Sequence, residues 1–540
     1  MSVEHLPAAE EAPTRFGIGQ AVRRLEDRRF LTGGGRYVDD ITLHKQAHAA
    51  VVRSPHAHAR ILHVHTEAAA AAPGVACVLT GADVVSDGLN GFTPAVMPED
   101  FGQPPGHRTR RPPLVADKAR FAGDAVALVV ADTPAQARDA ADMVEVEYEP
   151  LPAVIDASRA AAEGAPQVHE DCPQGNQAWM LTFGSAAAAD DAFAAAAHRV
   201  GLHLDNQRLT ANSIEPRGAV GEYDSGTGDY TLHTSTQNPH GVRHELAAVL
   251  GVPETRLRVI GPDVGGGFGM KGNPYPEDAL VLWASRRCGR PVKWIATRYE
   301  SLLTDTGGRD MTAAAELAFD DDGRIRGLRV STLSALGAYV GAVGLVPSLF
   351  AMRLMPGPYD VRAVHLTSRG IFTNTSPVNP YRGAGRPEAT YVIERLLDAA
   401  AAKLDLDGAE IRRRNLVRPE AIPYRTATGY VYDSGDFPRL LEACLARADW
   451  DGFPARRSES ERWGRRRGRA VSYFIEEAGV FNDRMELRFD PTGGVTIVAG
   501  TFSHGQGHVT TFTQMVHEWL GVPVESIRFL QGDTDQVPFG

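Results

Sequence analysis

Four short segments, far apart in the chain, carry clustered glycines, amide side chains or arginine. They are STQNPH at 235–240, VGGGFGMKG at 264–272, PYRGAGR at 380–386 and SHGQGH at 503–508. Glycine lets the backbone approach a ligand closely, and amide and guanidinium groups donate hydrogen bonds to anionic or carbonyl-like oxygens. Glycine-rich loops also serve as plain turns, so one segment alone says little. The four together predict a backbone-rich cradle for a ligand with several oxygen acceptors.

The glycines of the second segment also match the GxGxxG spacing of a dinucleotide-binding turn, through Gly267, Gly269 and Gly272. Such a turn must run directly into a helix whose N-terminus faces the pyrophosphate. Here Pro274 delays the helix, and Phe268 inserts a bulky side chain. We therefore interpret the segment as a tight loop whose N–H groups converge on negative oxygens, a nest.

A group of histidines offers a candidate metal site: His56, His58, His63 and His65. At strand spacing the last two share one face, whereas the first two follow a proline in an expected turn. No acidic or cysteine ligand accompanies them, and zinc sites require a complete ligand set. Surface histidines are the favoured interpretation, and metal binding is the alternative.

The composition is that of an ordinary globular protein. Hydrophobic residues make up 43% of the chain, and its length of 540 residues predicts three or four domains. The formal net charge of −11 argues against nucleic acid and anionic membrane surfaces as partners.

The sequence contains no run of about 18 apolar residues, so a membrane span is not expected. The acidic start of the chain lacks the apolar core of a secretory signal, and the four cysteines form no CxxC pair. We predict a cytoplasmic protein with reduced thiols.

Strands and helices alternate along the chain and predict its division into domains. Residues 1–22 are interpreted as a disordered leader, and residues 23–156 as an alternating α/β domain. A glycine- and proline-containing linker, 157–178, leads to a second alternating domain at 179–420. A third domain begins in 421–540, and because the final IRFLQGDTDQVPFG closes no element, we expect this domain to be incomplete.

Taken in order, the motifs resemble the molybdenum-cofactor subunit of the xanthine dehydrogenase and aerobic carbon monoxide dehydrogenase family. The matching segments are RRLEDRRFLTGGGRYVDDI, RSPHAHARI, VEVEYEPLP, GGGFG, YRGAGRPEA and GQGH, which cover nearly the whole chain. The resemblance implies an α+β protein. An N-terminal α/β hammerhead domain would be followed by two molybdenum-cofactor-binding α/β domains, the last one incomplete.

The resemblance also implies a set of cofactor-binding residues. Gln237 and Gln506 would hydrogen-bond the cofactor, the backbone of Phe268 and Gly269 would meet an oxygen ligand of the metal, and Arg382 would support the cofactor loop. The full set is Gln237, Gly266, Gly267, Phe268, Gly269, Arg382, Gly505, Gln506 and Gly507. The implied cofactor is molybdopterin, in the cytosine dinucleotide form, and its dithiolene rather than any side chain would hold the molybdenum.

Family members act by general-base catalysis, and the resemblance places the catalytic glutamate beyond Gly540, so no catalytic residue is assigned here. Glu476 and Glu477 are the nearest tempting carboxylates, but we expect them to edge a strand or the substrate channel.

Three positions depart from particular branches of the family. Purine hydroxylases have a glutamate where this chain has Gly272 and a phenylalanine where it has Ala384. Carbon monoxide oxidisers have a copper-binding cysteine where this chain has Gly383, so the soft ligand that copper needs is missing. Xanthine and carbon monoxide are therefore disfavoured as substrates.

The expected function is that of a molybdenum hydroxylase large subunit, which would add water-derived oxygen to an aldehyde or an N-heterocycle. Electrons would pass to a 2Fe-2S small subunit and an FAD-binding medium subunit, in a dimer of heterotrimers. Two alternatives remain: a catalytically silent cofactor-binding fragment or half of a split subunit, and a carbon monoxide dehydrogenase-like large subunit.

Overall fold

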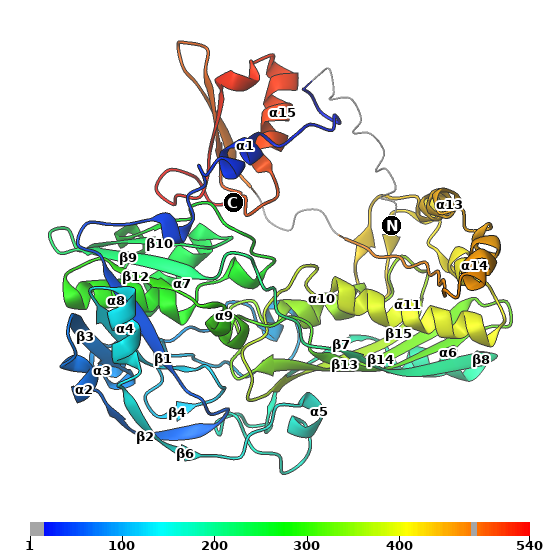
Figure 1. Cartoon of the computed structure of the whole chain (residues 1–540). Coiled ribbons are helices and arrows are strands. Elements are labelled where there is room, and N and C mark those ends of the chain that lie inside the picture. Colours follow the sequence, from blue (N-terminus) through cyan, green and yellow to red (C-terminus); the bar gives the residue numbers. More distant parts are fainter. Residues whose placement is uncertain (1–15, 477–482) are drawn as a thin grey trace.

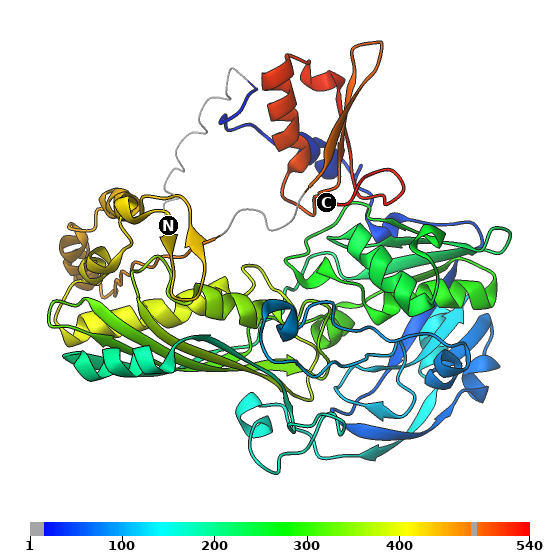
Figure 2. The ribbon, with the colours of Figure 1, turned by 180° about the vertical axis from the view of Figure 1, so that it is seen from behind.

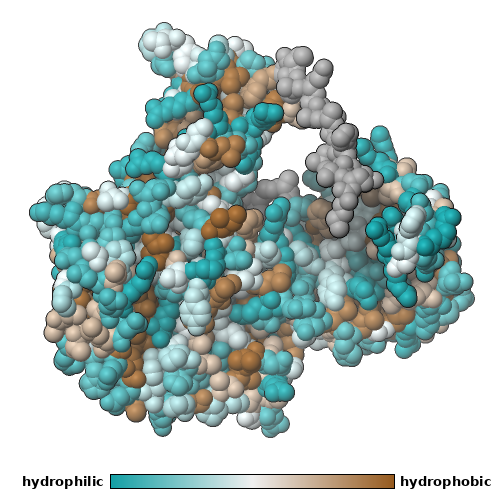
Figure 3. All heavy atoms as spheres, viewed as in Figure 1, coloured by the Kyte–Doolittle hydropathy of each residue, from teal (hydrophilic) through white to brown (hydrophobic). Residues whose placement is uncertain are grey.

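The computed structural model describes residues 16–476 and 483–540. These residues form a large lobe, an elongated lobe and a small lobe that sits above the other two in Figure 1. Residues 1–15 of the predicted leader, and Glu477, lie outside the described residues. Within the described ranges no helix combines the length and the apolar character needed to cross a membrane. Polar and apolar residues are mixed over the visible surface (Figure 3).

The large lobe is built on a seven-stranded sheet. Its strands are β1 (Ala47–Arg53), β3 (Val75–Thr80), β5 (Ala125–Ala131), β9 (Gly218–Asp224), β10 (Asp229–Thr234), β11 (Leu257–Ile260) and β12 (Val292–Ile295). The strand order is β11-β10-β9-β12-β1-β5-β3. β1 pairs in parallel with β12, which places Ala47 opposite Val292. The boundary predicted near residue 156 therefore runs through one continuous sheet.

Helix α8 (Pro276–Cys288) packs on this sheet beside α7 (Pro239–Leu250). All residues from Pro276 to Ser285 are buried. The helix approaches β9 closely because Gly221 has no side chain: a Cβ there would lie 2.6 Å from the backbone carbon of Val281. α8 follows the 264–272 loop in the sequence, so this tight packing fixes the position where the loop ends.

The rest of the predicted hammerhead domain packs against this sheet, and its own small sheet lies at the bottom of Figure 1. It contains a three-stranded sheet of order β4-β2-β6 and three helices. These elements are β2 (Ala59–His65), β4 (Lys118–Ala119), β6 (Glu145–Pro150), α2 (Glu67–Ala70), α3 (Gly81–Ser86) and α4 (Pro134–Ala141). Ala127, Val129 and Ala140 are buried in the core between α4 and β5.

The elongated lobe is built on a five-stranded sheet with helices on both faces (Figure 2). Its strands are β7 (Gln177–Gly184), β8 (His198–Asn206), β13 (Met311–Phe319), β14 (Ile325–Gly337) and β15 (Ala363–Phe372), in the order β7-β15-β14-β13-β8. One face is covered by α11 (Arg386–Lys403) and the other by α6 (Ala186–Ala195). Helices α10 (Val346–Leu354) and α12 (Gly408–Asn415) also belong to this lobe, whereas α9 (Arg298–Thr304) contacts Arg53 and Arg217 of the large lobe.

The segment 157–178, predicted as a linker, is an ordered connection. It contains α5 (Ala157–Ala160), and Val168 and Cys172 are buried in the core beside β15. The Asn176 side-chain amide donates to the carbonyl oxygens of Ala160 and Pro166, at 3.1 and 2.8 Å. These contacts hold the segment in one conformation, which a glycine- and proline-rich composition alone did not predict.

The predicted third domain, 421–540, is divided between two lobes. Its first part contains β16 (Tyr424–Arg425), β17 (Val431–Tyr432), α13 (Phe437–Arg447) and α14 (Phe453–Arg462). Leu441 and Leu445 of α13 pack into the core beneath α11, so this part belongs to the elongated lobe. The second part forms the small lobe, with β18 (Met485–Phe489), β19 (Val495–Ala499), β20 (Ile527–Leu530) and α15 (His508–Leu520).

The small lobe also holds the beginning of the described chain (Figure 1). Helix α1 (Leu25–Leu31) packs against α15. The Thr510 hydroxyl donates to a Glu26 carboxylate oxygen at 2.5 Å, and the Gln514 amide donates to the Gly17 carbonyl oxygen at 2.7 Å. The described part of the predicted leader is therefore held against α15.

Candidate functional site

Gln237 joins three of the four segments singled out in the sequence. It lies between β10 and α7, and its backbone N–H donates to the Lys271 carbonyl oxygen at 2.9 Å. Its Oε1 accepts from the Gly269 N–H at 2.8 Å, while its Nε2 lies 3.0 Å from Nε2 of His504. Both functional atoms of the amide are thus used to hold the glycine loop and the SHGQGH turn together.

The glycine loop 264–272 has a backbone conformation that residues with side chains rarely adopt. Gly266, Phe268 and Gly269 have φ angles of +93°, +56° and +93°. A Cβ on Gly267 would lie 2.3 Å from Gln237 Oε1, and one on Gly269 would lie 2.3 Å from the Pro380 carbonyl oxygen. Within residues 16–476 and 483–540, the N–H groups of Gly267 and Phe268 have no hydrogen-bond acceptor. Free N–H groups in such a loop suit anionic oxygens.

The PYRGAGR turn lies directly against the glycine loop. The Arg382 N–H donates to the Phe268 carbonyl oxygen at 3.0 Å. Gly383, Ala384 and Gly385 all have positive φ angles, so the turn is tightly coiled. The Arg382 side chain is exposed. The fourth segment therefore reaches the same place as the other three.

Arg309 holds this turn from behind, and sequence reasoning missed it. Its Nη2 donates to the Arg382 carbonyl oxygen at 2.6 Å, and its Nη1 donates to that of Tyr381 at 3.1 Å. Nη1 also pairs with the buried Glu388 carboxylate at 3.3 Å. Burial raises the pKa of Glu388, and the Arg309 guanidinium opposes that shift. The sequence feature that could have pointed to Arg309 is the GGRD segment at 307–310, in which two glycines precede the arginine.

The SHGQGH turn places His504 between the two predicted glutamines. The Gln506 Oε1 accepts from the His504 backbone N–H at 2.7 Å, and its Nε2 lies 3.1 Å from His504 Nε2. Burial lowers the pKa of His504 to about 4, so the ring is neutral at pH 7. A neutral imidazole has one acceptor nitrogen. The single lone pair of Nε2 is therefore shared between the amides of Gln237 and Gln506, and a proton there would oppose both contacts.

We expect His504 to make the protein less stable as the pH falls from about 6.5 to 4. The unfolded chain protonates this ring near pH 6.5, whereas the folded chain does so only near pH 4. Between these values the unfolded state binds more protons, so the free energy of unfolding falls by about 2–3 kcal/mol. Urea unfolding of the wild type and His504→Asn across this range measures the difference. Parallel curves for the two proteins would contradict the assignment.

The glycine loop is anchored beneath by a buried lysine. Lys271 Nζ donates to the carbonyl oxygen of Glu215 at 2.9 Å and to its carboxylate at 3.0 Å. The same carboxylate oxygen accepts from the Gly265 N–H and from the Ser235 hydroxyl, at 2.8 and 2.6 Å. Burial lowers the pKa of Lys271, and Glu215 opposes the shift. One ion pair therefore secures the start and the end of the loop.

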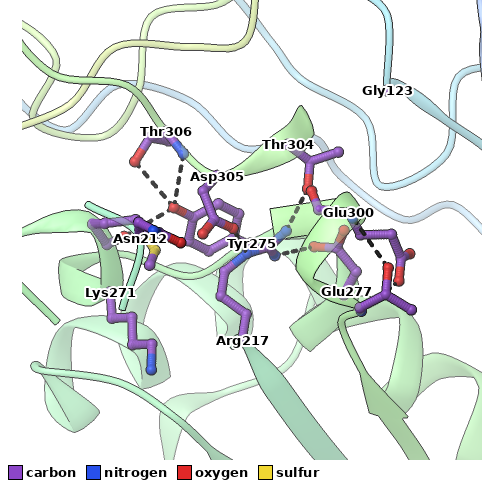
Figure 4. A network of polar contacts seen from close by, with 12 residues as sticks. Gly123, Asn212, Arg217, Lys271, Tyr275, Glu277, Glu300, Thr304, Asp305 and Thr306 are labelled. Atoms are coloured by element: carbon purple, nitrogen blue, oxygen red, sulfur yellow. Dashed lines mark hydrogen bonds and ion pairs between the residues drawn. The ribbon is translucent and has the colours of Figure 1, made fainter. Parts of the chain in front are cut away.

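A second buried network extends this support (Figure 4). Arg217 lies at its centre and pairs with Glu277 and Asp305, at 2.7 and 2.6 Å. Its guanidinium carbon lies 3.8 Å from the centre of the Tyr275 ring. The Tyr275 hydroxyl donates to the Met270 carbonyl oxygen at 2.9 Å, which connects the network to the glycine loop.

The structure also shows where the candidate metal-binding histidines and Glu476 lie. The expectation of surface histidines is wrong for His58, which is buried with its Nδ1 2.7 Å from the Pro152 carbonyl oxygen. His65 pairs with Glu147. Over the described part of the chain, no group of three or more potential ligands gathers to hold a metal ion. Glu476 forms an ion pair with Arg386 of the PYRGAGR turn. This carboxylate therefore borders the candidate site.

Comparison with known proteins yields matches along most of the chain. Residues 32–152 match the family model described as aldehyde oxidase and xanthine dehydrogenase, a/b hammerhead domain. Residues 168–416 and 443–540 match models described as molybdopterin cofactor-binding domain. The nine predicted cofactor-binding positions all lie within the latter two ranges.

Individual relatives agree with the family models. The chain is 36% identical to the carbon monoxide dehydrogenase large chain of Hydrogenophaga pseudoflava, over 95% of this chain and 66% of that one. It is 35% identical to the nicotine 6-hydroxylase large subunit of Paenarthrobacter nicotinovorans, over 98% and 65%. The crystal structure of quinoline 2-oxidoreductase from Pseudomonas putida 86 superposes with a TM-score of 0.90 at 35% identity, over 98% and 68%. The chain spans about two thirds of the length of these curated relatives.

Proposed function

We propose that this chain, which belongs to the xanthine dehydrogenase family of molybdenum hydroxylases, is a large subunit that hydroxylates an N-heterocycle or an aldehyde. The observation that carries the proposal is the meeting of all four segments at Gln237 and Phe268. These segments are separated by up to 267 residues in the sequence. Segments that serve only as turns would not be expected to meet at one place in the fold.

The residues present fit a molybdenum cofactor. The free N–H groups of Gly267 and Phe268, together with the second N–H of the Gln237 and Gln506 amides, would hold its oxygen-bearing groups. When bound, the cofactor would supply an oxygen donor and a two-electron acceptor. The chain itself would bind and orient it, because the amides and N–H groups are fixed in advance by His504, Lys271 and Arg309.

The form of the cofactor and the partners are part of the proposal. We infer the cytosine dinucleotide form of molybdopterin, a 2Fe-2S small subunit and an FAD-binding medium subunit, assembled as a dimer of heterotrimers in the cytoplasm. Support comes from relatives named as the large or gamma subunits of complexes. The sequence also predicts no iron–sulfur ligands in this chain, so electrons would have to leave through partners.

The PYRGAGR turn favours a heterocycle or an aldehyde over carbon monoxide. Gly383 has a φ of +97°, and a Cβ there would lie 2.5 Å from Cγ of Pro387. A copper-binding cysteine at this position would therefore require the turn to rearrange. Ala384 occupies little volume where a purine hydroxylase would place an aromatic ring. Relatives named for nicotine and quinoline support the choice of an N-heterocycle.

The test is metal and nucleotide analysis of the full chain, produced with its neighbouring subunits in a host that makes molybdenum cofactor. We expect about one molybdenum per chain and release of CMP on acid hydrolysis. Dye reduction with quinoline, nicotine or an aldehyde is expected when the catalytic glutamate of the family is also supplied, since no residue of this chain is assigned that role. Gln506→Ala should lower the molybdenum content about tenfold, since hydrogen bonds to charged groups contribute about 1.5–3 kcal/mol. Gln103→Ala is the control, because the Gln103 side chain accepts from the Thr182 N–H and contacts none of the four segments.

Each result has a distinct meaning. Absence of molybdenum in the wild type would overturn the proposal. Bound molybdenum without turnover of an N-heterocycle or an aldehyde would favour the catalytically silent cofactor-binding subunit. Turnover of carbon monoxide would favour the carbon monoxide dehydrogenase-like alternative, despite the glycine at position 383.

A further inference from the structure

Two cysteines that are 211 residues apart in the sequence meet in the large lobe. The Sγ atoms of Cys77 and Cys288 lie 2.7 Å apart. Cys77 is on β3, the last strand in the order of the seven-stranded sheet, and Cys288 is the last residue of α8. Both side chains are half-buried against the core that contains Leu79 and Leu280. The other two cysteines, Cys172 and Cys444, belong to other parts of the fold.

The surroundings of the pair favour thiol chemistry over metal binding. The hydrogen bond from the Cys77 thiol lowers the pKa of the Cys288 thiol, and Arg290 and Arg287 lower it further, against the effect of burial. Zinc sites are four-coordinate, and the described residues provide no third histidine, cysteine or carboxylate ligand near this pair. Cys288 is therefore the better nucleophile, and the Cys77 sulfur lies next to it.

We propose that Cys77 and Cys288 form a redox-modification site, which hydrogen peroxide converts to an intramolecular disulfide. The Cys288 thiolate attacks one peroxide oxygen and becomes a sulfenic acid, with hydroxide as the leaving group. The Cys77 sulfur then attacks the Cys288 sulfur, forming the S–S bond and releasing the hydroxyl. In total two thiols and one hydrogen peroxide give one disulfide and two waters. The sulfurs need to move from 2.7 Å to roughly 2.05 Å.

The disulfide would join β3 to the C-terminal end of α8. The other end of α8 carries Glu277, which pairs with Arg217 beneath the glycine loop. Oxidation would therefore attach the helix that supports the loop to the edge of the hammerhead strands. This inference does not depend on the proposed enzymatic function.

The experiment treats the natively folded full chain with one equivalent of hydrogen peroxide, then blocks the remaining thiols with N-ethylmaleimide. The Cys444→Ser background removes the exposed thiol and leaves three cysteines. We expect the free thiol count to fall from three to one, and to return to three with dithiothreitol. Mass spectrometry without reduction should show tryptic peptides 61–108 and 288–293 joined, with the loss of two hydrogen masses.

A matched variant tests whether the pair itself is responsible. In Cys77→Ser with Cys444→Ser the cross-linked peptide should be absent, and Cys288 should be recovered as the sulfenic acid. Repeating the oxidation in urea should abolish the selectivity, because the two sulfurs are then no longer neighbours. A count that stays at three in the folded protein, or a cross-link that involves Cys172, would overturn the proposal.

Discussion

Gly269→Ala should remove most of the bound molybdenum, to less than about a tenth of the wild-type content. The new Cβ would lie 2.3 Å from the Pro380 carbonyl oxygen, which is backbone and cannot swing aside. The φ of +93° adds strain that alanine tolerates poorly. Together we expect a cost of about 2–4 kcal/mol, taken up by displacement of the loop that lies against Arg382. Elemental analysis of the purified complex measures the effect.

Gly272→Ala is the matched control, because it lies in the same loop. Its φ is not in the left-handed region, and a Cβ there would meet no atom within 4 Å. We expect this variant to keep its molybdenum. Equal losses in both variants would indicate that any change in the loop is harmful, and equal retention would show that the loop does not bind the cofactor.

The second large effect is expected from Arg217→Met, which should lower the free energy of unfolding by about 3–5 kcal/mol. The change leaves the Glu277 and Asp305 carboxylates buried without their shared partner. The Arg217 guanidinium lowers the pKa of Glu277 against the effect of burial. Arg53 would still pair with Glu277, at 2.7 Å, which keeps the loss within this range. Urea unfolding followed by circular dichroism measures the change.

Arg326→Met provides the comparison on the surface. Its guanidinium pairs with Asp320, but the side chain is 58% exposed. Exposed ion pairs contribute about 0–1 kcal/mol, so this variant should be close to the wild type. If Arg217→Met were as mild, the network in Figure 4 would not stabilise the fold. Loss of molybdenum in Arg217→Met without loss of stability would instead assign the network to the loop alone.

Much of the candidate site could be predicted from the sequence because glycine is informative where the backbone must be unusual. The VGGGFGMKG loop and the PYRGAGR turn have positive φ angles at Gly266, Gly269 and Gly383. Residues with side chains are sterically disfavoured at positive φ angles, so a glycine at these positions indicates a left-handed backbone. The positive φ at Phe268 and Ala384 gave no such signal, since these residue types usually adopt other conformations.

Other features required the folded chain. Nothing near His504 in the sequence indicates that Gln237 lies on its other side, 267 residues away, or that burial keeps its ring neutral. Only the fold shows that Arg309 donates to the carbonyl oxygens of the PYRGAGR turn. Such partners depend on how strands from different segments are ordered in a sheet, and local periodicity does not carry that information.

The sequence by itself determined the family, the alternating α/β character and the four segments that meet around Gln237 and Phe268. Only the tertiary structure decided that β1 and β12 share one sheet, that residues 421–476 and 483–540 separate into two lobes, and that Cys77 meets Cys288. The physical reason is that local conformation follows from neighbouring residues, through glycine, proline and hydrophobic period. Contacts between distant residues follow from burial of apolar faces over the whole chain, which one segment cannot reveal.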